Sequence, residues 1–141
     1  MQKIKILPYF KFIELMQQLD LNDENIESKD VAIISIHDVT NTNHYFNNKH
    51  KNVLNVEFND WDREDTISEN CCNTIIHFLC DVEKYSNLIV HCTMGVSRSG
   101  AVGSFASDMY GLNFNELKKE NPQIVPNSCV YNKLRKCLEN K

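Results

Sequence analysis

The chain has 141 residues, of which 42% are hydrophobic and 24% charged, and its formal net charge is −4. This length can close one hydrophobic core, so we expect a single domain over residues 1–141. The acidic balance, without a basic stripe, argues against nucleic acid or an acidic lipid surface as a partner.

The amino-terminal segment is partly apolar, but Lys3, Lys5, Pro8 and Lys11 interrupt it. A membrane span needs about 20 consecutive apolar residues, so no span and no membrane contact are expected here. No small-residue cleavage site follows, which argues against a signal peptide. Six cysteines without a secretory signal indicate a reducing compartment. We therefore expect a cytoplasmic protein, with the nucleus as the alternative, and a monomer, although the sequence does not determine the oligomeric state.

Predicted strands and helices alternate along the chain. Strands are predicted at residues 3–6, 31–36, 53–58 and 88–90. Helices are predicted at residues 11–18, 101–109, 113–119 and 129–138, with another that begins near Thr66 or Ser68. This order predicts an α/β fold with a central, mostly parallel sheet of about four to five strands, flanked by helices.

Two polar loops separate these elements. Residues 40–51 are predicted to form a surface loop in which His44 and His50 are solvated. Residues 59–65, named here the acidic loop, follow the third predicted strand. The spacing of Thr66 and Glu69 matches a capping box at the start of the next helix.

The fourth predicted strand runs directly into the segment HCTMGVSRSG, residues 91–100. We name residues 92–98 the cysteine loop. In parallel α/β sheets, ligands bind beyond the carboxyl ends of the strands, where this loop falls. A free cysteine titrates near about 8.5, and a nucleophilic one must be a thiolate at neutral pH. Inward-facing backbone N–H groups and the start of the following helix can stabilise such an anion.

The residue types in this segment suit attack on a phosphate ester. Gly95 allows the backbone to approach a phosphate closely. Arg98, six positions after Cys92, has a planar fork that can bind two phosphate oxygens. Ser99 can hydrogen-bond to the sulfur and help it leave, and His91 is expected to orient the loop. The residues predicted to bind the phosphate are Thr93, Met94, Gly95, Val96, Ser97 and Arg98.

This C-x5-R loop between a strand and a helix resembles that of the protein-tyrosine phosphatase superfamily. It is most similar to the dual-specificity branch, whose loops read H-C-x-x-G-x-S-R-S, and Pro126-Asn127 resembles that branch's Pro-Asn. The resemblance implies a phosphatase fold and a phosphocysteine intermediate on Cys92. It also implies no metal or other cofactor, and a phosphorylated protein as substrate, through phosphotyrosine and phosphoserine or phosphothreonine. The alternative without a catalytic function is that Cys92 is an ordinary core cysteine and Arg98 a surface charge.

The resemblance further implies a general acid, an Asp on a loop upstream of the nucleophile. Asp60, Asp62 and Asp65 qualify, with Glu64 as a weaker candidate. Asp60 directly follows the predicted strand and precedes Cys92 by 32 positions, which leaves space for one helix and one strand. We therefore assign Asp60 as the acid, with Asp62 as the second candidate.

Other functions remain open at this point. No lysine or arginine lies between Cys92 and Arg98, which argues against phosphoinositides. Thr93 resembles the corresponding residue of RNA 5′-triphosphatases, although the acidic charge counts against RNA. A module that captures phosphorylated partners without turnover would fit if the acid were missing. A rhodanese or arsenate reductase with a similar anion loop is a third alternative. It is disfavoured, because low-molecular-weight arsenate reductases carry this loop near the amino terminus, whereas here the loop begins at residue 92 of 141.

Overall fold

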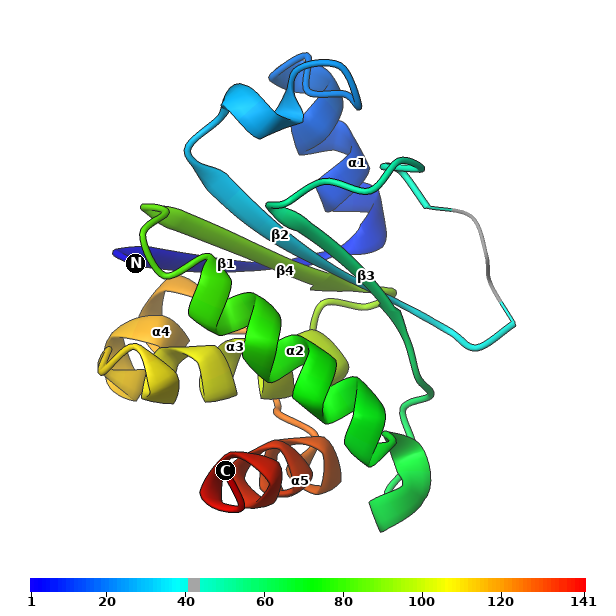
Figure 1. The fold of residues 1–141 in the computed structure, drawn as a ribbon, viewed down its shortest axis with the longest axis vertical. Helices are drawn as coiled ribbons and strands as arrows, with labels where there is room; N and C mark the ends of the chain where they lie inside the picture. The colour runs from blue at the N-terminus through cyan, green and yellow to red at the C-terminus, as the bar shows by residue number, and fades with distance from the viewer. Residues whose placement is uncertain (41–43) are drawn as a thin grey trace.

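Four parallel strands form one sheet in the order β1-β4-β2-β3 (Figure 1). The computed structural model describes residues 1–40 and 44–141. The strands are β1 (Lys3–Pro8), β2 (Val31–His37), β3 (Val53–Glu57) and β4 (Asn87–Cys92). The predicted parallel α/β sheet is therefore confirmed.

Helices cover both faces of this sheet. The helices are α1 (Tyr9–Gln18), α2 (Glu69–Asp81), α3 (Arg98–Met109), α4 (Phe114–Glu120) and α5 (Ser128–Glu139). Helix α1 lies on one face, and α2 to α5 lie on the other (Figure 1). No helix within the described residues is both long and apolar enough to cross a membrane.

The two faces of the sheet enclose separate hydrophobic cores. Side chains on a strand point alternately to opposite faces, so successive residues of β2 divide between these cores. Ile34 and Ile36 pack into the larger core with α2, α3 and α5, whereas Ile33 packs into the smaller core under α1. Burial on both faces explains why β2 is almost wholly apolar.

Strand β1 lies at an edge of the sheet. Side chains from the segment after α4 form hydrogen bonds with backbone groups on its free side. Asn121 accepts from the Ile6 N–H at 2.8 Å and donates to the Ile4 carbonyl at 3.1 Å. Gln123 donates to the Ile6 carbonyl at 3.0 Å. The edge is thereby protected from pairing with another chain, and β1 is held beside β4.

The start of α2 differs from the prediction. Ser68 is the N-cap, and its hydroxyl accepts from the Cys71 N–H at 3.0 Å. Thr66 lies in a short 3-10 turn, where its hydroxyl donates to the Asn59 carbonyl and accepts from the Trp61 N–H at 2.8 Å. The predicted capping box at Thr66 is wrong, because this hydroxyl closes the acidic loop instead.

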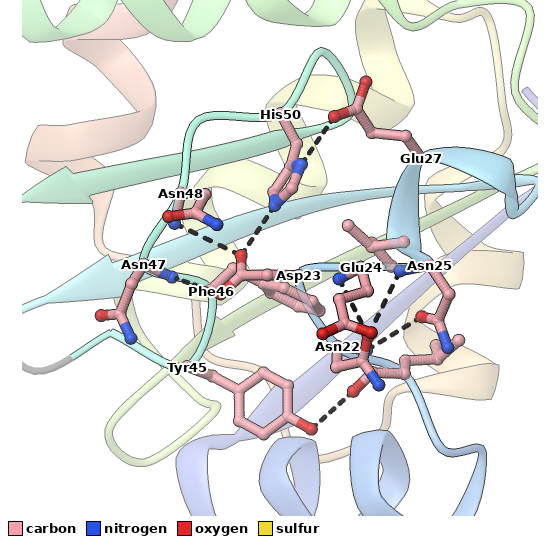
Figure 2. Close-up of polar contacts among 12 residues, drawn as sticks. Asn22, Asp23, Glu24, Asn25, Glu27, Tyr45, Phe46, Asn47, Asn48 and His50 are labelled. Atoms are coloured by element: carbon pink, nitrogen blue, oxygen red, sulfur yellow. Dashed lines mark hydrogen bonds and ion pairs between the residues drawn. The ribbon is translucent and has the colours of Figure 1, made fainter.

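The predicted solvation of His44 and His50 is also wrong, while residues 41–43 of that loop lie outside the described residues. The His50 side chain is only 5% exposed and contacts Glu27 and Asp23, each at 2.7 Å (Figure 2). These hydrogen bonds, first to Glu27 and then to Asp23, raise the pKa of His50. The His44 ring packs against His37, with ring centroids 4.4 Å apart. The two partners of His50 lie 23 and 27 positions away in the chain, so no local pattern predicts these contacts.

Candidate active site

Cys92 is the last residue of β4, at the carboxyl edge of the sheet, and it is only 2% exposed. Its Sγ lies 3.0 Å from the Ser99 Oγ and accepts from the Gly95 N–H at 3.3 Å. The chain therefore curls around the sulfur before α3 begins at Arg98.

Gly95 is required by the packing of the cysteine loop against β1. Its φ is +69°, and a Cβ there would lie 2.3 Å from the Pro8 nitrogen and 2.5 Å from the Leu7 carbonyl carbon. We expected the missing side chain to make room for a phosphate, but in this structure it makes room for the end of β1. Further bonds hold the loop from outside: the Tyr9 N–H donates to the Thr93 carbonyl, and Gln123 donates to the Gly95 carbonyl, both at 3.2 Å.

The guanidinium of Arg98 is buried beneath the cysteine loop, and the residue is 5% exposed. Its Nη1 donates to the Asp38 Oδ1 at 2.7 Å and to the Phe58 carbonyl at 2.8 Å, and Nη2 donates to the Thr93 hydroxyl at 3.3 Å. Asp38 follows β2 and Phe58 follows β3, so residues at the ends of two neighbouring strands orient the guanidinium of Arg98.

The sequence analysis missed Asp38. One signal could have found it: a carboxylate that directly follows a buried strand lies at the carboxyl edge of a parallel sheet, where ligand-binding residues gather. Its partner is 60 positions away, so only the sheet order reveals the pair.

Asp60 lies over the cysteine loop and is held there from two sides. Its Oδ1 accepts from the Ser97 hydroxyl at 2.9 Å and from the Asn127 side-chain amide at 2.7 Å. Asn127 is the N-cap of α5, and it also donates to the Trp61 carbonyl at 3.0 Å. The start of α5 thereby fixes the acidic loop, a role of Asn127 that the sequence did not indicate.

These residues line a pocket of about 300 Å³. Its lining residues are Asp60, Cys92, Met94, Val96, Ser97 and Arg98. Among the candidate acids, Asp62 instead contacts the Cys129 thiol at 3.6 Å, and Asp65 pairs with Arg63 at 2.7 Å. The geometry therefore favours Asp60 over the other carboxylates.

His91 points away from this pocket, toward the α1 face of the sheet. Its ring stacks on Phe12, with ring centroids 4.0 Å apart, and lies 5.6 Å from the ring of His37. Burial, reinforced by neighbouring His37, lowers the pKa of His91 to about 3. Burial and then His44 lower the pKa of His37 to about 4. A neutral ring packed in a core suits the support of the loop, and it does not suit proton transfer at neutral pH.

The structure brings most of the predicted residues to one place. Cys92, Gly95, Arg98, Ser99 and Asp60 surround the sulfur or line the pocket. Thr93 and Met94 are both exposed residues. Met94, Val96 and Ser97 line the pocket, whereas Thr93 does not line it and accepts from Arg98.

Comparison with known proteins identifies the family. The sequence profile of protein-tyrosine phosphatases matches residues 2–134. The chain belongs to the protein-tyrosine phosphatase family. The resemblance predicted from the cysteine loop is thereby confirmed, and the family is one of protein phosphatases. No curated protein sequence matches the chain significantly.

Solved structures of this family share the fold at low sequence identity. The human tyrosine phosphatase-like serine/threonine/tyrosine-interacting protein is 14% identical, with a TM-score of 0.59 over 97% of this chain and 91% of that chain. Human DUSP28 is 17% identical, with a TM-score of 0.56 over 97% and 92%. The Cydia pomonella PTP-2 phosphatase is 11% identical, with a TM-score of 0.60 over 96% and 86%.

Proposed function

We propose that the chain is a cysteine-dependent phosphatase that hydrolyses phosphotyrosine, and phosphoserine or phosphothreonine, in proteins. The observation that carries this proposal is the pocket in which Cys92, Arg98 and Asp60 meet. Such a site combines a nucleophile, a charge clamp for phosphate oxygens and a carboxyl group for proton transfer.

The first step is attack by the Cys92 thiolate on the phosphorus atom. An S–P bond forms and the bond to the ester oxygen breaks, while protonated Asp60 gives its proton to the leaving oxygen. The departing group is the unphosphorylated hydroxyl of tyrosine, serine or threonine. The N–H of Gly95 and the guanidinium of Arg98 stabilise negative charge in this step.

The second step is hydrolysis of the phosphocysteine. Water attacks phosphorus and gives a proton to the Asp60 carboxylate, and the S–P bond breaks to release phosphate and the thiolate. Ser99, whose Oγ is 3.0 Å from the sulfur, stabilises the thiolate as it leaves. Both hydrogen bonds to Asp60 go to Oδ1, and Oδ2 has no partner among the described residues, so it is the oxygen placed to carry the proton.

Hydrolysis of a small aryl phosphate under reducing conditions, with and without a chelator, tests this proposal. Cys92→Ser should abolish turnover, because the alcohol is a poor nucleophile and leaving group. Asp60→Asn should lower turnover and leave phosphate binding intact, since it removes a proton donor and no anion ligand.

Two results would contradict parts of the proposal. A larger loss of turnover in Asp62→Asn than in Asp60→Asn would mean that the acid is misassigned. No turnover by the intact protein, combined with tight binding of a phosphopeptide, would favour a module that captures phosphorylated partners.

A further inference from the structure

The segment between α4 and α5 lies against the outside of the cysteine loop. We name residues 121–127 the clamp segment. It donates hydrogen bonds to the carbonyls of three consecutive loop residues. The pairs are the Gln123 side-chain amide with Gly95 at 3.2 Å, the Val125 N–H with Val96 at 3.0 Å and the Asn127 N–H with Ser97 at 3.0 Å. A fourth loop carbonyl, that of Thr93, accepts from the Tyr9 N–H at 3.2 Å.

These outer contacts fix the direction of the N–H groups in the loop. In a planar trans peptide, the carbonyl and the N–H of the next residue point in opposite directions. Four carbonyls bonded on the outside therefore turn four N–H groups to the inner side. These N–H groups belong to Met94, Val96, Ser97 and Arg98. The same four residues line the pocket together with Asp60 and Cys92. Across residues 1–40 and 44–141, none of the four N–H groups donates to a protein acceptor, so all four can serve an anion in the pocket.

The clamp segment is itself anchored, and it can therefore impose this orientation. Ile124 is 1% exposed and belongs to the larger core. Asn121 is 3% exposed and holds the edge of β1. The amino group of Lys118, on α4, donates to the Pro122 carbonyl at 2.9 Å and to the Ile124 carbonyl at 2.5 Å. The segment is thus held by the core, by the sheet and by α4.

The peptide between Gly95 and Val96 depends most on an outer contact. Glycine accepts many backbone conformations, so this peptide can rotate at little cost. Rotation would bring the Gly95 carbonyl oxygen to the pocket side and turn the Val96 N–H away from it. The other three carbonyls are held by backbone N–H groups, whereas that of Gly95 is held by the side chain of Gln123. The same amide also donates to the Ile6 carbonyl at 3.0 Å, which ties it to β1.

We propose that Gln123 is a positioning residue for the phosphatase reaction. By holding the Gly95 carbonyl outward, it keeps the Val96 N–H directed at the phosphate. This inference rests on the proposed function, because it places the phosphate in the Cys92 pocket. Gln123 does not touch the phosphate and acts only through the cysteine loop. Its loss weakens one hydrogen bond to a charged group, both when phosphate binds and when it is transferred.

The variant Gln123→Met tests the inference, because methionine has a similar length and size but no amide donor. Gln123 is exposed, so the variant should fold. The Kd of inorganic phosphate, measured by calorimetry, should rise about tenfold, and kcat/KM for a small aryl phosphate should fall by about the same factor. Saturation with phosphate should shift the Val96 amide resonance in the wild type and shift it much less in Gln123→Met. A residue with only a structural role would not change that response.

Asn87→Leu is the matched control. Asn87 is also exposed, and its side-chain amide donates to the Asp30 carbonyl at 3.2 Å. It lies at the start of β4, at the opposite end of the strand from Cys92. This substitution likewise removes an exposed amide that bonds to the backbone. It should change neither the Kd of phosphate nor kcat/KM.

Three outcomes would overturn the inference: equal phosphate affinity in Gln123→Met and the wild type, an equal loss in Asn87→Leu, or a wild type that binds no phosphate. Failure of the proposed function gives a different result. The wild type would then bind phosphate without hydrolysing the aryl phosphate, while calorimetry and the Val96 resonance would still report whether Gln123 orients the loop.

Discussion

The two faces of the sheet are built by different means. On the face covered by α2 to α5, helices with regular apolar spacing pack against the strands, and Cys92 belongs to that core. On the face covered by α1, a smaller core holds aromatic residues beside the rings of His37 and His91. The first face follows from local sequence patterns, whereas the second depends on contacts between residues far apart in the chain.

The candidate active site joins these two faces. The cysteine loop grows from β4 and α3, but the end of β1 packs against Gly95, and Asp38 at the end of β2 holds Arg98. The cysteine loop has a recognisable sequence motif, but its geometry depends on the end of β1 and on Asp38, which belong to no such motif. Substitutions at the contacts between the faces should reveal this dependence.

The largest expected effect comes from Gly95→Ala. A Cβ at this position would lie 2.3 Å from the Pro8 nitrogen, so the loop or β1 must shift. Because a misplacement of about 1 Å can cost about 100-fold in rate, kcat/KM for an aryl phosphate should fall by about that factor.

Gly111 is the matched control: it has the same φ of +69°, but no atom lies within 4 Å of a Cβ built there. Gly111→Ala should cost about 1 kcal/mol in stability and leave kcat/KM intact; equal effects would refute the packing argument.

Asp38→Ala should have the next largest effect, because it removes the carboxylate that orients Arg98 at 2.7 Å. We expect kcat/KM to fall about tenfold to 100-fold, with a higher KM as well as a lower kcat, since in the proposed mechanism the guanidinium binds phosphate in both the ground state and the transition state. Asp65→Ala, which removes a carboxylate paired with exposed Arg63, should leave both constants unchanged. An Asp38→Ala enzyme with normal kinetics would show that Arg98 is oriented by its other contacts.

The buried histidines predict loss of stability in acid. Burial lowers the pKa of His37 to about 4, below about 6.5 for an unfolded chain. The unfolded state therefore binds a proton that the folded state does not, and the free energy of unfolding falls as the pH drops below about 6.5. Between pH 7 and pH 5, His37 should contribute about 2 kcal/mol of this loss. Denaturant unfolding of His37→Phe at both pH values should show a loss smaller by that amount; an identical loss would mean that His37 does not remain neutral.

His50 predicts the opposite dependence and the smallest effect. Its pKa is raised by Glu27 and Asp23, so its stabilising contribution is full below about pH 6.5 and disappears as the pH rises through the raised value. His50→Gln should therefore cost about 1 kcal/mol at pH 6 and almost nothing at pH 9. Denaturant titrations at the two pH values check this, and a cost that does not vary with pH would show that the ring acts only through neutral hydrogen bonds.

Much of the site could be predicted because its residues are close in sequence. Cys92, Gly95, Arg98 and Ser99 lie within eight consecutive positions between a strand and a helix, so their spacing reflects their geometry. The proposed acid was harder to choose, because Asp60, Asp62 and Asp65 share one loop and the sequence does not show which way each side chain points. The structure places Asp60 at the pocket through Ser97 and Asn127, contacts that span 37 and 67 positions.

The sequence by itself determined the parallel α/β fold, the position of the cysteine loop at the carboxyl edge and the resemblance to the protein-tyrosine phosphatase family. Hydrophobic periodicity and residue spacing are local properties, and they suffice for these conclusions. Only the tertiary structure decided that Asp38 holds Arg98, that Gly95 makes room for β1, that Thr66 closes the acidic loop and that His50 is paired. Each of these depends on the order of strands in the sheet or on the path of a loop, which local patterns do not encode.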